Sequence, residues 1–531
     1  MADRAPTVVI VGGGLAGLSA ACALAGSGFH VTVFERRPFL GGRASSYEHP
    51  GTGEVVDNCQ HVLFGSCTNL LAFYETISIA NKIRWFDRMT FIEPGGRQSV
   101  LEPTFLPAPF HLTRSFLGFK FLNASDKLSL ARGLMSLILH KPQDEDDRTS
   151  FQDWLIRHRQ TPAAIERFWK PILVSALSED MDRISVPYAA QVVRESMKSS
   201  EARRMGIPNV PLTELYNAAR DYISANNGTL RLRDSVQSLL PTPRGVCVKL
   251  QNSEEEFDYG VLAVPFDALA KLLPDSAEPP SSSNPSKDLR EKLTHFETSP
   301  ITGVHLWFDR QITDLPHAVL LDRTIQWMFH KSRLLTRGAP LASSPTVSAE
   351  VDRDGSSTGS SPFSTVPDTA PEGRPNLAQG VSPGYADKTT ESRRDDRNPR
   401  ESPSYVELVI SSSKSLRQKS RQEIIDIALT ELREFFPAAR DANLVKATVI
   451  KEVNATFSPT PGIDRYRPTS ETPWPRIFLA GDWIATGWPA TMEGAVRSGY
   501  KAAESITKDA GAGKRFLVPD LSPTGLMRIL S

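Results

Sequence analysis

The stretch from Val8 to Glu35 constrains the fold more than any other part of the chain. An apolar run is followed by a G-x-G-x-x-G frame, a stretch of small residues and a second apolar run, the glycines being Gly12, Gly14 and Gly17. Glu35 ends the second run about 20 residues after the glycines, where an acidic side chain can accept a hydrogen bond from a ribose hydroxyl. This order predicts a strand, a turn, a helix and a strand that together bind a dinucleotide.

Each glycine has its own physical role in such a turn. Gly12 allows the tight turn, Gly14 lets the backbone approach a pyrophosphate, and Gly17 lets the helix pack closely on the sheet. The pyrophosphate then meets the free N–H groups and the positive end of the helix dipole. By itself the motif is compatible with NAD, NADP or FAD.

Composition excludes several other classes of protein. The chain has 531 residues, enough for two or three domains, and its 61 basic and 61 acidic residues give no global field that favours nucleic acid. No uncharged apolar run is long enough to cross a bilayer. The apolar stretch after Arg4 is interrupted by three glycines, so we interpret it as part of the fold and not as a secretion signal. We expect a cytoplasmic protein.

The cysteines predict neither a disulfide nor a metal site. There are four of them, and they lack C-x-x-C or Cys/His spacing: Cys22, Cys59, Cys67 and Cys247. They suit a reducing compartment.

The rest of the chain alternates between sheet-forming and helical patterns. Residues 1–70 begin the nucleotide-binding domain, 71–225 are mainly helical, and 226–275 return to that domain with strands from Gly228 to Pro265. Residues 276–460 form a substrate domain, 461–510 complete the nucleotide-binding domain, and 511–531 form a tail. Further strands are predicted at 301–309, 324–329, 405–410 and 476–482, and further helices at 128–139, 151–177, 420–436 and 490–506.

Two segments are predicted to be loops. Residues 338–404 are rich in Ser, Pro, Gly, Asp and Arg, and cannot bury enough apolar surface to offset their ordering entropy. We interpret them as a disordered insertion between two neighbouring strands. A shorter Pro/Ser loop is predicted from Asp275 to Lys287.

Two more motifs narrow the dinucleotide to a flavin. The first is Glu35 to Arg43, with Gly41-Gly42-Arg43, followed by Asp57-Asn-Cys-Gln-His61; the second runs from Leu479 to Gly499 and includes Gly-Asp-Trp and Gly-Trp-Pro-Ala-Thr-Met-Glu-Gly-Ala. Together with the first motif they resemble the flavin amine oxidase and phytoene desaturase superfamily. Within it, the 57–65 and 481–495 stretches look most like the hydroxysqualene dehydroxylases, the squalene-associated FAD-dependent enzymes.

The resemblance implies an α/β fold with a Rossmann-like, glutathione-reductase-like FAD-binding domain and a mixed-sheet plus helical substrate domain. It also implies FAD-binding roles for particular residues. Glu35 takes the adenosine ribose, Asp482 the ribityl chain or pyrophosphate, and Met492 offers its N–H to the flavin C2 carbonyl. The full set implied is Gly12, Gly14, Gly17, Glu35, Arg36, Gly42, Arg43, Val236, Gly481, Asp482 and Met492.

The helix after Pro489 has a physical argument of its own. A helix starting near Ala490 presents unpaired N–H groups, whose partial positive charge stabilises negative charge on a reduced flavin. The structural alternative is that Gly481 and Asp482 only cap an element and that Glu493 is an ordinary first-turn acid.

The resemblance further implies reduction of hydroxysqualene to squalene, with hydride from reduced flavin and loss of water. His61 is the candidate proton donor and Trp488 the candidate aromatic wall, together with Trp483 and Trp327. A hydrogen-bonded structural histidine and ordinary core aromatics are the alternatives. Cys59 stands where the dehydroxylases usually have glycine, which would strain the backbone if a positive φ were needed there.

Other functions stay open on the sequence alone. A carotenoid or phytoene desaturase and an amine oxidase share the cofactor, and a non-catalytic flavin-binding partner of a prenyl synthase complex is a third class. The predicted partners are an apolar isoprenoid substrate, an external electron donor and a prenyl synthase. Because such a substrate is poorly soluble in water, peripheral contact with a membrane surface is also predicted. Residues Phe516 to Leu530 either contact lipid or dock on the protein, and docking is favoured.

Overall fold

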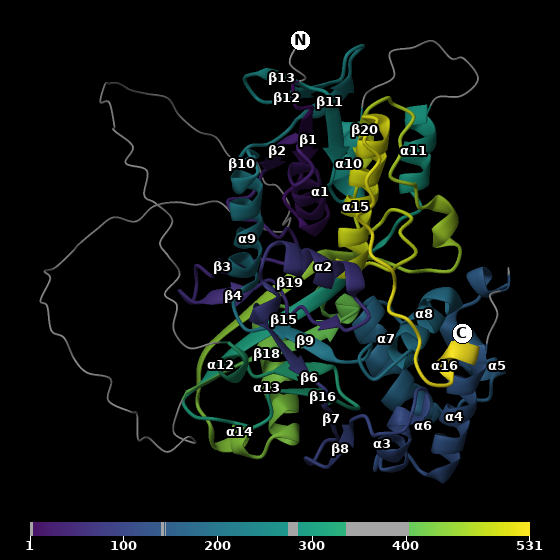
Figure 1. Ribbon diagram of the computed structural model, residues 1–531. Coiled ribbons are helices and arrows are strands. Elements are labelled where there is room, and N and C mark those ends of the chain that lie inside the picture. The colour runs from purple at the N-terminus through teal and green to yellow at the C-terminus, as the bar shows by residue number, and fades with distance from the viewer. Residues whose placement is uncertain (1–3, 140–142, 144, 274–284, 336–402, 531) are drawn as a thin grey trace, which may run out of the picture. The chain divides into compact units, whose positions relative to one another are not determined.

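The computed structural model describes residues 4–139, 143, 145–273, 285–335 and 403–530 (Figure 1). The predicted insertion at 338–404 therefore lies almost wholly outside the described residues, as does most of the predicted loop at 275–287. The end of that loop prediction is wrong, because helix α11 begins at Pro285 and runs to Leu293.

The nucleotide-binding half is built on a five-stranded parallel sheet. Its strands come from four separate parts of the sequence, in the order β10 (Thr229–Leu232), β2 (His30–Glu35), β1 (Thr7–Val11), β14 (Tyr259–Leu262) and β20 (Ile477–Leu479). β1 and β14 are buried along nearly their whole length, as expected of central parallel strands. The predicted strand–turn–helix–strand unit is thus confirmed.

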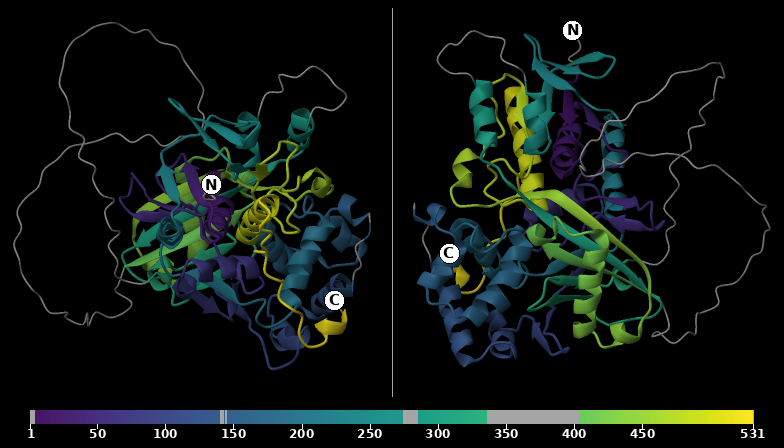
Figure 2. Two further views of the ribbon diagram at one scale, coloured as in Figure 1. Left: turned by 45° about the horizontal axis from the view of Figure 1, so that its top comes forward. Right: turned by 180° about the vertical axis from the view of Figure 1, so that it is seen from behind.

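Two helices from opposite ends of the chain pack together beside this sheet. α1 (Leu15–Ala25) lies against α15 (Met492–Asp509), as Figures 1 and 2 show. The contact is close because a Cβ at Gly499 would lie 2.2 Å from the Ala16 carbonyl oxygen. The Ser19 hydroxyl donates to the Val496 carbonyl at 3.3 Å. This packing brings the two ends of the sequence together.

The second half is built on a seven-stranded mixed sheet. Its order is β19 (Leu444–Phe457), β15 (Thr298–Phe308), β18 (Ser404–Ser411), β17 (Trp327–Phe329), β16 (His317–Leu320), β7 (Met89–Ile92) and β8 (Gln98–Leu101). β17 and β18, which flank the predicted insertion, pair antiparallel. The prediction that these two strands are neighbours is therefore confirmed. α13 (Arg421–Phe435) begins with a capping box at Ser420 and packs its apolar side chains into a core with this sheet.

Residues 71–225 were predicted to be mainly helical. Helices form most of residues 113–225, but residues 83–101 contain strands. The helices are α3 (Thr113–Leu117), α4 (Ala124–Leu139), α5 (Phe151–Arg157), α6 (Pro162–Ala164), α7 (Lys170–Leu177), α8 (Val186–Met197) and α9 (Leu212–Ala225). A π-helix, Ile165–Trp169, interrupts the predicted helix at 151–177. β6 (Ile83–Phe86), β7 and β8 occupy the stretch before α3, because β7 and β8 extend the mixed sheet.

The smaller elements connect these parts. They are β3 (Ser46–Glu48), β4 (Val55–Asp57), β5 (Leu63–Phe64), α2 (Thr68–Thr76), β9 (Met205–Pro208), β11 (Ser238–Pro241), β12 (Val246–Lys249), β13 (Glu254–Phe257), α10 (Phe266–Leu272), α12 (Lys331–Leu334), α14 (Ala438–Asp441) and α16 (Met527–Leu530). In the part of the chain that the structure describes, no helix combines the length and the apolar character needed to cross a membrane.

Candidate dinucleotide site

In the glycine turn, Gly12 and Gly17 are required by the fold, whereas Gly14 leaves room for a ligand. Gly12 has φ +112°, and a Cβ there would lie 2.4 Å from the Ala263 carbonyl oxygen. A Cβ at Gly17 would lie 1.9 Å from the Gly12 oxygen. At Gly14 the only protein atom near a Cβ is the Cα of Gly42, at 3.8 Å. Gly14 therefore leaves open space where the pyrophosphate is expected, and the site fits a dinucleotide.

Glu35 lies at the carboxyl end of β2, beside this turn. Its buried carboxylate accepts hydrogen bonds from the N–H groups of Gly13 at 2.7 Å and Arg37 at 2.8 Å. The Asp234 N–H donates to the Glu35 carbonyl, which places the segment leading to the buried Val236 next to the predicted ribose position. Arg36 is exposed to solvent.

The second glycine pair packs directly on the first turn. The Gly41 N–H donates to the Gly13 carbonyl at 2.9 Å, and a Cβ at Gly42 would lie 3.0 Å from the Gly14 Cα. Gly42 has φ +62°, a conformation that favours glycine. The glycine turn at 12–17 and the motif at 41–43 thus form one surface.

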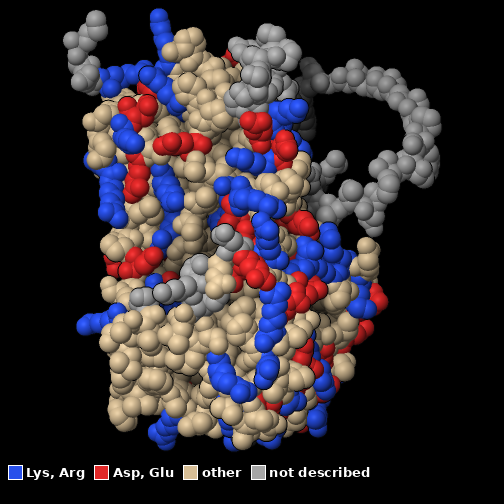
Figure 3. All heavy atoms as spheres, turned by 90° about the vertical axis from the view of Figure 1, so that its right-hand side faces the viewer, with Lys and Arg blue, Asp and Glu red and all other residues tan. Residues whose placement is uncertain are grey.

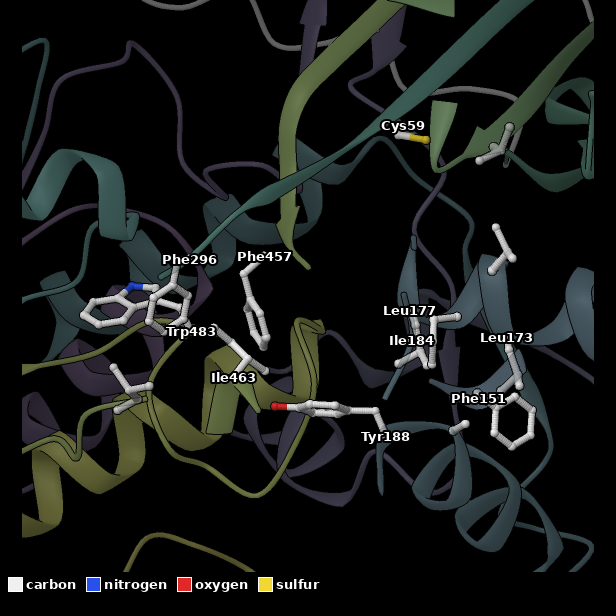
Figure 4. Close-up of a cluster of buried hydrophobic side chains, with 14 of the residues drawn as sticks. Cys59, Phe151, Leu173, Leu177, Ile184, Tyr188, Phe296, Phe457, Ile463 and Trp483 are labelled. Atoms are coloured by element: carbon white, nitrogen blue, oxygen red, sulfur yellow. The ribbon is translucent and has the colours of Figure 1, made fainter. Parts of the chain in front are cut away.

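Arg43 and Asp482 join the two ends of the chain. An Arg43 guanidinium nitrogen lies 2.6 Å from an Asp482 carboxylate oxygen, and a second donates to the Ala455 carbonyl at 2.7 Å. Both residues line a small pocket with Trp483 and Phe457. Phe296 lies between Trp483 and Phe457 (Figure 4). Its ring centroid is 6.1 Å from that of Trp483 and 5.9 Å from that of Phe457. The predicted partners for phosphate and ribityl groups therefore sit at the edge of an aromatic cluster.

A buried arginine that the sequence analysis missed positions the loop before α15. The Arg467 guanidinium donates to the carbonyls of Asp482 at 3.1 Å, Trp483 at 3.2 Å and Trp488 at 2.8 Å. Gly481, at the start of the loop, has φ +154° and donates its N–H to the Ser498 hydroxyl at 2.8 Å. One side chain thus fixes the path of residues 482–488.

The helix after this loop begins at Met492, not at Ala490 as predicted. Thr491 is its N-cap, accepting from the Gly494 N–H at 3.1 Å, and this cap sets the start. Among the described residues, no protein acceptor takes the N–H of Met492 or of Glu493. These two free donors fit the predicted bond to a flavin carbonyl.

Glu493 is a cap for another helix and not an ordinary first-turn acid. Its fully buried carboxylate accepts from the Asn69 N–H at 3.1 Å and the Leu70 N–H at 2.7 Å, at the start of α2. Arg497 pairs with it at 2.6 Å. The role of Glu493 in this structure is therefore to lock α15 to α2.

The predicted catalytic side chains do not contact each other. His61 Nδ1 lies 2.7 Å from the Cys59 carbonyl, and burial lowers the pKa of the imidazole, which favours its neutral form. Trp488 is buried with the Arg497 guanidinium 4.9 Å from its ring centroid. Proton donation by His61 and a substrate wall at Trp488 stay predictions. Cys59 does not have a positive φ, so the expected strain is absent.

The other two candidate tryptophans lie in apolar surroundings. Trp327 stacks on Phe329 at 5.5 Å and donates to the Ser175 hydroxyl at 2.8 Å, whereas Trp483 donates to the Val264 carbonyl at 3.0 Å. Both belong to the large core cluster that spans the two halves.

A buried ionic cluster lies directly behind the 57–61 segment. The Lys331 ammonium is 2.5 Å from an Asp57 oxygen, 2.8 Å from the Gln60 side-chain oxygen and 3.4 Å from a Glu407 oxygen. All three charged side chains are at most 5% exposed. Asp57 also accepts from the Ser46 hydroxyl and the Leu212 N–H. Lys331 thus anchors both ends of the 57–61 segment, which carries the candidate proton donor His61.

The cluster holds two acids and one base, so one acid is disfavoured in its charged form. Burial would raise the pKa of Asp57, but Lys331 and Ser46 hold it below its ordinary value. Burial dominates for Glu407, whose pKa is raised from 4.5 to about 7. The folded chain therefore binds more protons at Glu407 than the unfolded chain between pH 4.5 and 7. Protonation of Glu407 therefore stabilises the folded chain fully below pH 4.5, and this stabilisation is lost as the pH rises to about 7.

Replacing Glu407 with glutamine is expected to remove this pH dependence. Glutamine resembles the neutral acid, so the variant should gain stability relative to the native chain as the pH rises from 4.5 to 8. The gain should reach roughly 3 kcal/mol, from 1.36 kcal/mol per pKa unit. Urea unfolding of both proteins at several pH values measures it. A difference in unfolding free energy that stays constant across that range would contradict the assignment.

Comparison with known proteins agrees with this geometry. The family described as flavin containing amine oxidoreductase matches residues 15–507. A probable zeta-carotene desaturase of Synechococcus elongatus is 26% identical over 94% of this chain and 98% of its own length. A 15-cis-phytoene desaturase of the same organism is 25% identical over 94% of this chain and 95% of its own.

Solved structures with low sequence identity share the fold. An oxidoreductase from Methanosarcina mazei has a TM-score of 0.63 at 16% identity, over 94% of this chain and all of the other. Cyclohexylamine oxidase from Brevibacterium oxydans has a TM-score of 0.60 at 14% identity, over 96% of this chain and all of the other. The family match covers nearly the whole chain, so the protein belongs to the flavin-containing amine oxidoreductase family and is an FAD-dependent oxidoreductase.

Proposed function

We propose that this flavoenzyme acts on a long isoprenoid hydrocarbon. The observation that carries the proposal is the similarity, over 94% of the chain, to enzymes named as desaturases of zeta-carotene and phytoene. A membrane-soluble hydrocarbon needs a site walled by apolar side chains, and the molecule has a large buried aromatic cluster formed by β7 and by the segments that precede α4 and α7. Its rings are Phe91, Phe119, Phe121, Phe168 and Trp169.

Two reactions of such a substrate are candidates. The relatives named as desaturases favour desaturation, in which two hydrogens leave the hydrocarbon and a double bond forms. The motifs at 57–65 and 481–495 favour hydride transfer in the opposite direction, from reduced flavin to hydroxysqualene, at the carbon that loses its hydroxyl as water. Flavin accepts or donates hydride in either direction. The relatives give desaturation the stronger support.

The chain's own residues have the same tasks in both directions. Glu35 and the glycine turn would hold the dinucleotide, the Arg43–Asp482 pair would join the two chain ends around it, and the free N–H groups of α15 would stabilise negative charge on a bound flavin. Lys331 holds the 57–61 segment in place. In the reductive direction an external electron donor is also required, and we propose a transient protein or nicotinamide donor for it.

Anaerobic spectroscopy of the purified holoprotein distinguishes the reactions. Bleaching of oxidised flavin by phytoene or zeta-carotene supports desaturation. Reoxidation of reduced flavin by hydroxysqualene, with squalene formed, supports dehydroxylation. Bleaching by simple amines alone would overturn the isoprenoid proposal, and binding without turnover of any substrate would favour a non-catalytic partner of a prenyl synthase.

A further inference from the structure

The exposed hydrophobic side chains of this protein are concentrated on one face. Most of the large hydrophobic side chains exposed in the described residues come from residues 105–139 and from the carboxy-terminal α16 region. We call this set the apolar face: Phe105, Leu106, Phe110, Leu117, Leu128, Leu139, Leu526 and Ile529. Phe105 is 97% exposed and Ile529 81%. A soluble protein rarely leaves so many large apolar side chains together in water without a use for them.

Contacts within the structure show that the members of the apolar face are neighbours. The Leu526 N–H donates to the Ala108 carbonyl at 2.9 Å, which joins the tail to the 105–110 loop. Met527 is buried against Ala108 and Ile138, which joins the tail to the end of α4. The Lys127 ammonium donates to the Leu117 carbonyl at 2.6 Å, which joins the start of α4 to α3. The face is therefore continuous from α3 along α4 to α16.

Helical spacing agrees with this arrangement. Leu128, Arg132, Met135 and Leu139 are separated by four, three and four residues, so they lie along one side of α4. In Figure 3 the lower left of the molecule is correspondingly almost uncharged, with isolated blue side chains.

The charges around the apolar face are mainly positive. Residues 102–139 and 521–530 carry Arg114, Lys120, Lys127, Arg132 and Arg528, against one exposed acid, Glu102. Asp126 is buried, where its carboxylate accepts from the Asn123 N–H. Since the whole chain has no net charge, this local excess of cations is a property of the face and not of the composition.

We propose that the apolar face docks on the surface of an anionic phospholipid bilayer. Apolar side chains ringed by Lys and Arg have the chemistry of a membrane-surface element, in which the former enter the acyl boundary and the latter meet lipid phosphates. A second copy of the chain fits less well, because a two-fold interface would place the same cations opposite one another. The carboxy-terminal tail fits both alternatives that the sequence left open. Its backbone docks on the protein, while the side chains of Leu526 and Ile529 stay exposed and can meet lipid.

The apolar face also adjoins the buried aromatic cluster. Leu117 is exposed, and its neighbour Phe116 contacts Phe119 at 6.0 Å between ring centroids. Phe119 in turn stacks on Phe121 at 4.8 Å and contacts Phe168 at 6.2 Å. Apolar side chains thus continue from the proposed lipid contact into the helical region. The docking itself does not depend on which reaction the enzyme performs.

Sedimentation of the full-length holoprotein with vesicles tests the proposal. Vesicles of phosphatidylcholine with phosphatidylglycerol should bind the native protein, and salt or pure phosphatidylcholine should weaken the binding. The double variant Phe105→Asp, Ile529→Asp should bind at least about tenfold less, since two apolar anchors are replaced by anions. Val445→Asp is the matched control, because Val445 is 60% exposed on β19 and outside the face.

The remaining outcomes overturn the proposal. One is native protein that stays in the supernatant with anionic vesicles; another is equal loss of binding in the control and the double variant. A protein that sediments as a dimer in the absence of lipid, and that the double variant converts to a monomer, would assign the face to a second copy instead. Flavin content and unfolding temperature of each variant show that the holoprotein is intact.

Discussion

Gly14→Val is expected to abolish FAD binding in a chain that still folds. A Cβ at Gly14 has only the Gly42 Cα within 4 Å, at 3.8 Å, and the residue has φ −78° and ψ 177°, an extended conformation open to valine. The added side chain would stand where the pyrophosphate is expected to approach the backbone. We expect the FAD dissociation constant to rise at least about 100-fold, equivalent to about 2.8 kcal/mol. Fluorescence titration of the apoprotein with FAD measures it.

Two further glycine variants separate loss of cofactor from loss of fold. Gly513→Val places the same side chain in open space at an exposed position, and should bind FAD like the native protein. Gly17→Val should unfold the nucleotide-binding half, because its Cβ would lie 1.9 Å from the Gly12 oxygen. If Gly14→Val retains native FAD affinity, the pyrophosphate does not lie over this turn.

The cofactor half was predictable because its signals are local. The glycine spacing, the acid at the end of the second strand and the paired motifs at 41–43 and 481–492 each lie within a short stretch of sequence. The structure joins them: Gly41 bonds to Gly13, and Arg43 pairs with Asp482 across more than 400 residues. α15 begins at Met492 and not at the predicted Ala490, because Thr491 caps the helix. The position of Pro489 alone did not indicate this cap.

The half built on the seven-stranded mixed sheet was less predictable, because its strands pair with partners far away in the sequence. β7 and β8 are short strands that the sequence analysis placed in a helical region, and β7 pairs with β16, more than 200 residues further along the chain. β19 was missed as well, since polar residues interrupt the apolar pattern of its 14 residues, such as Lys451 and Asn454. Tertiary pairing overrides weak local preference in such strands.

One member of the ionic cluster, Glu407, is marked by its local sequence. Glu407 is an acid within the otherwise apolar strand Tyr405 to Ile410, which marks a buried polar contact. Its partners come from α12 and from the end of β4, and nothing in their local sequence marks Lys331 as buried. Only the fold brings these groups together.

Lys331→Met is expected to destabilise the protein by about 3–5 kcal/mol, because it leaves the Asp57 carboxylate buried without its cation. Lys331 is 3% exposed at its side chain and lies 2.5 Å from Asp57, so water cannot replace the lost charge. The matched control is Lys446→Met, which breaks a 2.7 Å pair with Glu54 in which both side chains are 41% exposed, and should cost less than about 1 kcal/mol. Urea unfolding of the holoprotein measures both.

A second variant tests whether Lys331→Met destabilises the protein through the unpaired Asp57 carboxylate or through lost packing. Adding Asp57→Asn to Lys331→Met removes the uncompensated carboxylate, so the double variant should regain much of the stability that the single variant loses. Because Lys331 also binds Gln60, we expect the single variant to release FAD more readily than Lys446→Met does at equal folded fraction. A Lys331→Met protein as stable as the Lys446→Met control would show that Asp57 is neutral in the folded chain. The ionic cluster would then not hold the 57–61 segment through charge.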